Sequence, residues 1–121
     1  MDILITNNPL AEAKYRDKYQ VEFLDVSLAG TLIRVRDLVH KGHRLLTHPL
    51  SGSVKPNETP YKTVLLSGKP GPADAQSVYM IEECLAAVRK FASKPIPERY
   101  LPDLQTVDLS LIDGALNREF T

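Results

Sequence analysis

The chain has 121 residues, of which 43% are hydrophobic and 25% are charged, and these proportions are typical of one soluble globular domain. Fifteen Lys and Arg residues balance fifteen Asp and Glu residues, which argues against a nucleic-acid-binding protein because such proteins carry a basic excess. No apolar run is long enough to cross a membrane and the N-terminus lacks a basic signal-peptide start, so we expect a cytoplasmic protein. Near-neutral charge also lowers the electrostatic barrier to forming a homo-oligomer.

The N-terminal part of the sequence predicts a strand, a helix and a second strand. Residues 2–6 form a continuous apolar run, which is typical of a strand covered on both faces. Asn8 is a favoured helix N-cap and Pro9 suits the first helical position, so we expect a helix over residues 9–17. Apolar and polar side chains then alternate over residues 19–26, which predicts a strand.

The middle of the sequence predicts a longer helix followed by a short strand and a loop. Ser27 can cap a helix over residues 28–39, where apolar side chains recur at helical spacing. Gly42 is a plausible C-cap that ends this helix. Residues 44–47 predict a third, buried strand, and residues 49–62 form a loop rich in Pro, Ser and Asn.

The last part of the sequence predicts one strand, one secure helix and an extended tail. Residues 63–67 predict the fourth strand, and an apolar stripe over residues 73–92 predicts the third helix. Three prolines keep the chain extended beyond residue 95. Apolar side chains alternate over residues 107–111 and predict a further strand, although residues 111–120 can equally hold a short helix.

Strands that alternate with helices predict an α/β protein, here a small three-layer sandwich with a mainly parallel, Rossmann-like sheet. We expect a single domain over residues 1–121, with a core of residues 1–94 and an extended segment of residues 95–121 packing on it. Ligands of such folds bind beyond the carboxyl ends of the strands. Asn7 and His48 follow the first and third predicted strands, so both are expected at the same edge of the sheet.

A candidate binding site therefore combines the strand ends with the loop after His48. The imidazole of His48 can exchange hydrogen bonds or protons, Gly52 lets the backbone form an anion-binding nest, and Lys55 supplies a positive charge. The predicted ligand-binding residues are Asn7, Asn8, His48, Ser51, Gly52, Ser53, Lys55 and Asn57. The alternative is a stiff loop whose polar side chains bond its own backbone.

The two asparagines have both a structural and a functional interpretation. Asn8 is favoured as a helix cap over a ligand contact. Asn7 is less explained by structure, and together with the first N–H groups of the helix it can bind a carboxylate or phosphate.

Other chemistry is poorly supported by the sequence. His40 and His43 precede the third predicted strand and His48 follows it, and four strand residues span about 13 Å, so these imidazoles should not share a metal ion. Cys84 lies inside the third predicted helix, where a packed core thiol is expected. The segment around Ser51 is not a Gly-x-Ser-x-Gly elbow, and no Gly-x-Gly-x-x-Gly motif predicts a dinucleotide cofactor. We therefore expect neither a metal nor a cofactor.

Two segments carry a family resemblance: ITNNPL at residues 5–10 and HKGHRLLTHPLSGSVKPNETPYK at residues 40–62. They resemble the GrdX family, small proteins encoded with the glycine, sarcosine and betaine reductase genes of anaerobic amino-acid fermenters. The resemblance covers the chain in order and length. It implies a cytoplasmic accessory protein whose partners are components of the reductase, and it brings no catalytic residues.

Two functions follow from these observations. The first is a non-catalytic binding module for a small anion or a partner protein. The alternative is a small enzyme in which His48 acts as acid or base while Ser51 or Ser53 positions the substrate.

Overall fold

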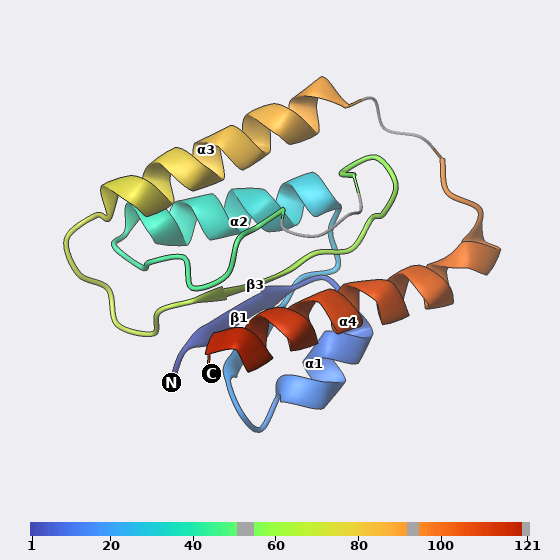
Figure 1. The fold of residues 1–121 in the computed structure, drawn as a ribbon, viewed down its shortest axis with the longest axis horizontal. Coiled ribbons are helices and arrows are strands. Elements are labelled where there is room, and N and C mark those ends of the chain that lie inside the picture. Colours follow the sequence, from blue (N-terminus) through green and yellow to red (C-terminus); the bar gives the residue numbers. More distant parts are fainter. Residues whose placement is uncertain (51–54, 92–94, 120–121) are drawn as a thin grey trace.

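The computed structural model describes residues 1–50, 55–91 and 95–119. The elements are β1 (Ile3–Thr6), α1 (Pro9–Tyr15), β2 (Gln20–Phe23), α2 (Leu28–His40), β3 (Thr63–Leu66), α3 (Ala75–Lys90), the 3-10 helix η1 (Glu98–Tyr100) and α4 (Leu101–Glu119). Helices α2 and α3 lie on one side of the sheet, while α1 and α4 lie on the other (Figure 1). None of the helices in the described ranges is long and apolar enough to cross a membrane.

The sheet has three strands in the order β2-β1-β3 and is mixed. Strand β1 pairs in parallel with β2 and antiparallel with β3. The expected mainly parallel, Rossmann-like sheet is therefore wrong. The physical reason lies in the connection after α2: the chain first runs back along the sheet and then turns, so β3 enters from the edge where β1 ends (Figure 1).

The third predicted strand, residues 44–47, is reduced to a single antiparallel bridge between Leu45 and β3. Two backbone hydrogen bonds, from Leu46 N–H to Leu65 and from Ser67 N–H to Arg44, hold this segment together with two side-chain bonds. The N–H of Leu45 donates to Ser77 Oγ at 3.0 Å, and Thr47 Oγ1 accepts the N–H of Leu65 at 3.0 Å. The segment thus stays beside β3 without becoming a full strand.

The predicted extended tail is also wrong, because α4 is a helix of 19 residues. The strand expected at residues 107–111 is absent, since this range belongs to α4. The alternative of a helix in residues 111–120 agrees with the structure as far as Glu119, the last residue of α4. Pro102 lies in its first turn, where a missing N–H leaves no intrahelical bond unmade. Ile112 and Leu116 are each 3% exposed and lie four residues apart, so they share one face of the helix.

Two apolar clusters hold the layers together, one on each face of the sheet. Alternate residues of β1 divide between them, because successive strand side chains point to opposite faces. Ile3 and Ile5 pack with α2 and α3, whereas Leu4 packs with α1 and α4. The buried residues of the first cluster are Ile3, Ile5, Leu28, Leu32, Val35, Leu38, Val39, Val64, Leu66, Ile81 and Leu85. Those of the second are Leu4, Tyr15, Tyr19, Leu65, Ile112 and Leu116.

The other predicted strands and helices are confirmed. Strands occur within residues 2–6, 19–26 and 63–67, and the three predicted helices exist with small differences at their ends. Gly42 follows α2 with φ of 107°, a left-handed conformation that favours glycine. A Cβ at Gly42 would lie 1.9 Å from the carbonyl oxygen of Gly71, so this turn excludes a side chain.

We predict that Leu116→Ala lowers the free energy of unfolding by about 2–5 kcal/mol, because it removes a buried side chain from the contact between α4 and the sheet. Val107→Ala is the matched control on the same helix, since Val107 is 41% exposed, and it should change stability by less than about 0.5 kcal/mol. Urea unfolding followed by circular dichroism measures both. Equal stabilities for the two variants would show that α4 does not depend on this contact.

Candidate functional site

Asn7 follows β1 directly and is 6% exposed, and its side chain bonds the backbone of two other segments. Its Nδ2 donates to the carbonyl of Val26 at 2.9 Å and to that of Pro60 at 2.7 Å, while its Oδ1 accepts the N–H of Lys62 at 2.8 Å. These three bonds join the end of β1, the segment after β2 and the start of β3. Both amide hydrogens are occupied, so ligand binding by Asn7 stays a prediction that rests on Oδ1 alone.

Asn8 is fully buried and caps α1, as the sequence predicted. Its Oδ1 accepts the N–H of Leu10 at 3.1 Å. Its Nδ2 donates to the carbonyl of Gln105 and to Asp108 Oδ2, both at 2.9 Å on α4. The side chain is therefore engaged at both ends, and direct ligand contact by Asn8 stays a prediction.

A buried chain of polar groups links the two central strands to α4. The hydroxyls of Thr6 and Thr63 lie 2.7 Å apart, and Thr63 Oγ1 donates to Asp108 Oδ2 at 2.8 Å. Asp108 is 4% exposed, and the hydrogen bonds it accepts offset the cost of burying its carboxyl group. Helix α4 is thereby held against the edge where β1 ends and β3 begins.

His48 lies at this same edge and is exposed. Its Nδ1 accepts the N–H of Leu50 at 3.0 Å, so the neutral ring carries its proton on Nε2. His48 lines a small, partly open cavity together with Lys62 and Thr63. On its other side it borders shallow hollows against Met80 and Glu83 of α3. Asn7 and His48 thus both adjoin the start of β3, the edge on which the sequence placed them.

The remaining loop residues of the predicted site are distributed differently. Ser51, Gly52 and Ser53 lie outside the residues that the structure describes. Lys55 is exposed. Asn57 is partly buried, and its Oδ1 has no hydrogen-bond partner in the described ranges. Their role in binding stays a prediction.

His40 and His43 make separate contacts. His40 Nε2 lies 3.3 Å from Glu82 on α3, and the buried His43 places Nδ1 2.8 Å from the carbonyl oxygen of Ser67. In the described part of the chain, no three His, Cys, Asp or Glu side chains gather in a way that could hold a metal ion.

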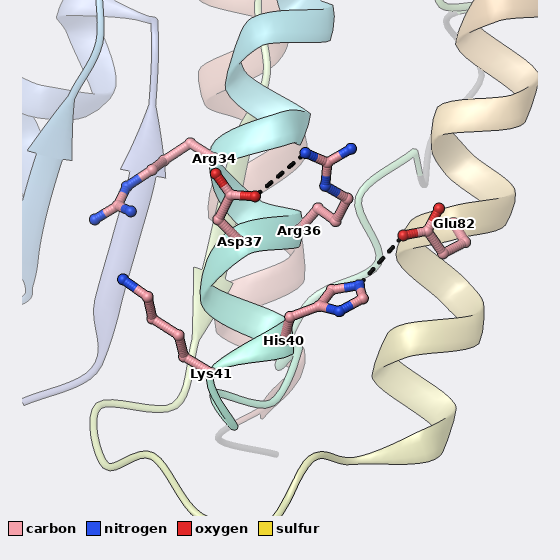
Figure 2. A pocket seen from close by; sticks show the side chains of 6 residues that line it. All are labelled: Arg34, Arg36, Asp37, His40, Lys41 and Glu82. Atoms are coloured by element: carbon pink, nitrogen blue, oxygen red, sulfur yellow. Dashed lines mark hydrogen bonds and ion pairs between the residues drawn. The ribbon is translucent and has the colours of Figure 1, made fainter.

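A broad, shallow hollow lies across the outer surfaces of α2 and α3, and Figure 2 shows its side chains. Its positive groups are mostly paired: Arg36 contacts Asp37 at 3.3 Å, and His40 contacts Glu82. Arg34 donates two hydrogen bonds, of 2.6 and 3.0 Å, to Glu22 on β2. Exposed pairs of this kind contribute little binding energy, so this surface is a weaker candidate than the strand ends.

Lys62 is the functional candidate that the sequence analysis missed. It is 7% exposed, and no described residue accepts a hydrogen bond from its ammonium group. Burial lowers the pKa of Lys62, while the carboxylate of Asp108 and the thiol of Cys84 act in the opposite direction. The signal in the sequence is weak, because a lysine just before a strand usually belongs to a solvated loop.

Cys84 on α3 is buried at 4% exposure, which confirms the predicted core thiol. Burial raises the pKa of Cys84 to about 11, and the nearby Lys62 opposes that rise. A thiol in this state is mostly protonated at neutral pH and therefore unreactive.

The model of a protein family described as GrdX-like protein matches residues 3–117 of this chain. Comparisons with curated proteins and with solved structures gave no match.

We predict that Asn7→Ala lowers the free energy of unfolding by about 3 kcal/mol, since it leaves two carbonyls and one N–H without their partner. Asn117→Ala is the control, because Asn117 is exposed on α4, and it should change stability by less than about 0.5 kcal/mol. Thermal and urea unfolding measure the difference. A stability loss no larger than that of Asn117→Ala would mean that Asn7 does not hold the strand ends together.

We predict that Cys84 is alkylated by iodoacetamide at pH 8 at least about 100-fold more slowly in the folded protein than in urea. A rise from 9.0 to about 11 in the pKa reduces the thiolate population by that factor, and burial slows the reaction further. Mass spectrometry over time gives both rates. Comparable rates would show that the thiol is open to solvent.

Proposed function

Because the chain belongs to the GrdX-like protein family, we propose that it serves a glycine, sarcosine or betaine reductase system as a non-catalytic binding module. The family name suggests an association with glycine reductase. The proposed binding surface is the strand-end rim, which we define as Asn7, His48, Lys55, Asn57 and Lys62.

The observation that carries this proposal is the side chain of Asn7, whose three hydrogen bonds reach two separate segments of backbone at the rim. A binding surface is more selective when the backbone beneath it is held rigidly. Asn7 thereby fixes the backbone of Pro60 and Lys62, and Lys62 lines the same small cavity as the exposed His48. Loops on such a support are where binding residues concentrate.

The donors of the rim favour an anionic group. The hydrogen bond from Leu50 to His48 Nδ1 leaves Nε2–H as the donor of the neutral ring. Lys55 adds an exposed positive charge. The anionic group belongs either to a small molecule or to a side chain of a reductase component, and the test separates these sources.

The catalytic alternative uses the same histidine as acid or base, with Ser51 or Ser53 positioning the substrate. The geometry of His48 favours binding over this alternative, because an Nε2–H held by a backbone bond at Nδ1 is suited to donating to an anion. We therefore place binding first.

We predict that the His48→Ala/Lys55→Ala double variant captures at least about tenfold less reductase than the wild-type protein from cells that express the reductase, since it removes two donors of the rim. His48→Ala/Lys69→Ala is the matched control. Lys69 is also exposed but lies beyond the opposite end of β3. The control variant should therefore lose less than half as much captured reductase as the His48→Ala/Lys55→Ala variant loses. Quantitative mass spectrometry of the captured proteins provides the measurement.

Equal capture by the wild-type protein and the double variant would remove the rim as the partner surface. Adding a small anion such as acetate during capture shows whether the anionic group belongs to a small molecule or to a side chain of a reductase component. If the anion belongs to a small ligand rather than to a reductase subunit, acetate leaves the captured amount unchanged.

A further inference from the structure

Strand β2 forms one edge of the sheet, and this edge is open in the described part of the chain. The strand order β2-β1-β3 places β2 outermost, with β1 as its neighbour on the inner side. The opposite edge differs, because residues 44–47 run beside β3 and form hydrogen bonds with it. The chain therefore covers one edge of its own sheet and leaves the other uncovered.

The hydrogen bonds to β1 show which backbone groups of β2 face outward. The N–H of Gln20 donates to the carbonyl of Asp2 and the N–H of Leu24 to that of Thr6, both at 2.9 Å. Because the hydrogen-bonding groups of successive strand residues point in opposite directions, those of Val21 and Phe23 point away from β1. No hydrogen bond from a described residue reaches these outward groups. Such a row of donors and acceptors is a template for a further strand.

Exposed edge strands are usually protected against pairing, and β2 lacks the usual protections. Lysine, proline, a bulge or an unusually short strand serves this purpose in other proteins. Residues 20–23 contain neither lysine nor proline, keep an unbroken register with β1 and form a strand as long as β1 and β3. The backbone of β2 is therefore free to accept another strand.

The one charge on β2 is neutralised within the protein. Arg34 donates hydrogen bonds of 2.6 and 3.0 Å to the two carboxylate oxygens of Glu22. Figure 2 shows Arg34 extending from α2 on the side away from Glu82 of α3, so the ion pair lies on the flank of the open edge. The edge thus presents a balanced pair of charges.

We propose that β2 pairs antiparallel with β2 of a second copy of this chain, across a two-fold axis that passes between the two Glu22 residues. The two three-stranded sheets then form one sheet of six strands. Val21 of each copy lies opposite Phe23 of the other, and each of these pairs exchanges two backbone hydrogen bonds. This inference is independent of the proposed function.

The side chains of β2 favour a second copy as the occupant. A β-branched residue opposite an aromatic residue is a favourable cross-strand pair, and the symmetry forms the pair of Val21 and Phe23 twice. Symmetry also places Glu22 opposite Glu22, and like charges in that position are destabilising unless they are compensated. Arg34 provides this compensation in each copy, which a strand of another protein would not require. The formal net charge of zero also leaves little long-range repulsion between copies.

The proposed dimer leaves the strand-end rim accessible. Strands β1 and β2 are parallel, so both end at the edge of the sheet that carries the rim. Antiparallel pairing of the two β2 strands directs the rims of the two copies to opposite ends of the six-stranded sheet. Dimer formation and binding at the rim are therefore compatible.

Sedimentation equilibrium of the full-length protein between about 5 and 500 µM tests the assembly. A monomer–dimer equilibrium is expected with a Kd on the order of 50 µM, because two short strands bury an area at the low end for specific interfaces. A protein that stays monomeric throughout this range would overturn the proposal, and the edge would then be left for a strand of a different protein.

Cysteine cross-linking tests the register. Glu22→Cys should form a disulfide-linked dimer under mild oxidation, because directly opposite residues of a non-hydrogen-bonded pair have Cα atoms about 4.5 Å apart. Gln20→Cys is the matched control: Gln20 is more exposed than Glu22, but the two copies of residue 20 are separated by about 13 Å along the strands. It should cross-link at least about tenfold more slowly. Cys84 is 4% exposed and should not contribute. Equal rates for the two variants would reject this pairing.

A proline variant tests the backbone bonds. The N–H of Val21 faces away from β1, so Val21→Pro removes a bond of the dimer without removing one from the single copy. Its Kd for dimerisation should rise at least about tenfold, whereas Val21→Thr, which keeps the N–H and the branched side chain, should stay within about threefold of the wild-type protein. A Val21→Pro variant that is folded by circular dichroism and dimerises like Val21→Thr would contradict the proposal. The cysteine variants decide the question even where Val21→Pro does not fold.

Discussion

The buried carboxylate of Asp108 is the interaction on which the arrangement at the strand ends depends. It accepts hydrogen bonds from the cap of α1 and from the first residue of β3, so one side chain connects three elements. Asn8 and Thr63 meet it only because β1 and β3 are antiparallel neighbours, with Thr6 opposite Thr63. The last helix, the first helix and the central strands are therefore positioned together.

The side chain of Asn7 likewise connects separate parts of the fold, but through their backbone groups. Its amide bonds the segments that follow β2 and precede β3, and these segments lie far from it in sequence. Polar side chains at strand ends are usually available to ligands. Here the side chains of Asn7 and Asn8 instead form hydrogen bonds within the protein, to the neighbouring backbone segments and to α4. The proposed binding at the rim therefore relies chiefly on other side chains, such as those of His48 and Lys55.

Lys62 lies close enough to Asp108 for the carboxylate to oppose the lowering of its pKa by burial, but no described ion pair joins the two side chains.

The sequence by itself determined the local elements: apolar periodicity and capping residues located β1, β2 and β3 and the helices α1, α2 and α3. It also placed Asn7 and His48 at one edge, since both follow apolar runs. Only the tertiary structure decided the direction of β3, the loss of the strand at residues 44–47 and the helical state of the tail. Strand direction depends on the path of a long connection, and α4 gains much of its stability from packing on Leu4 and Leu65. The burial of Lys62 likewise depends on contacts between residues far apart in the chain.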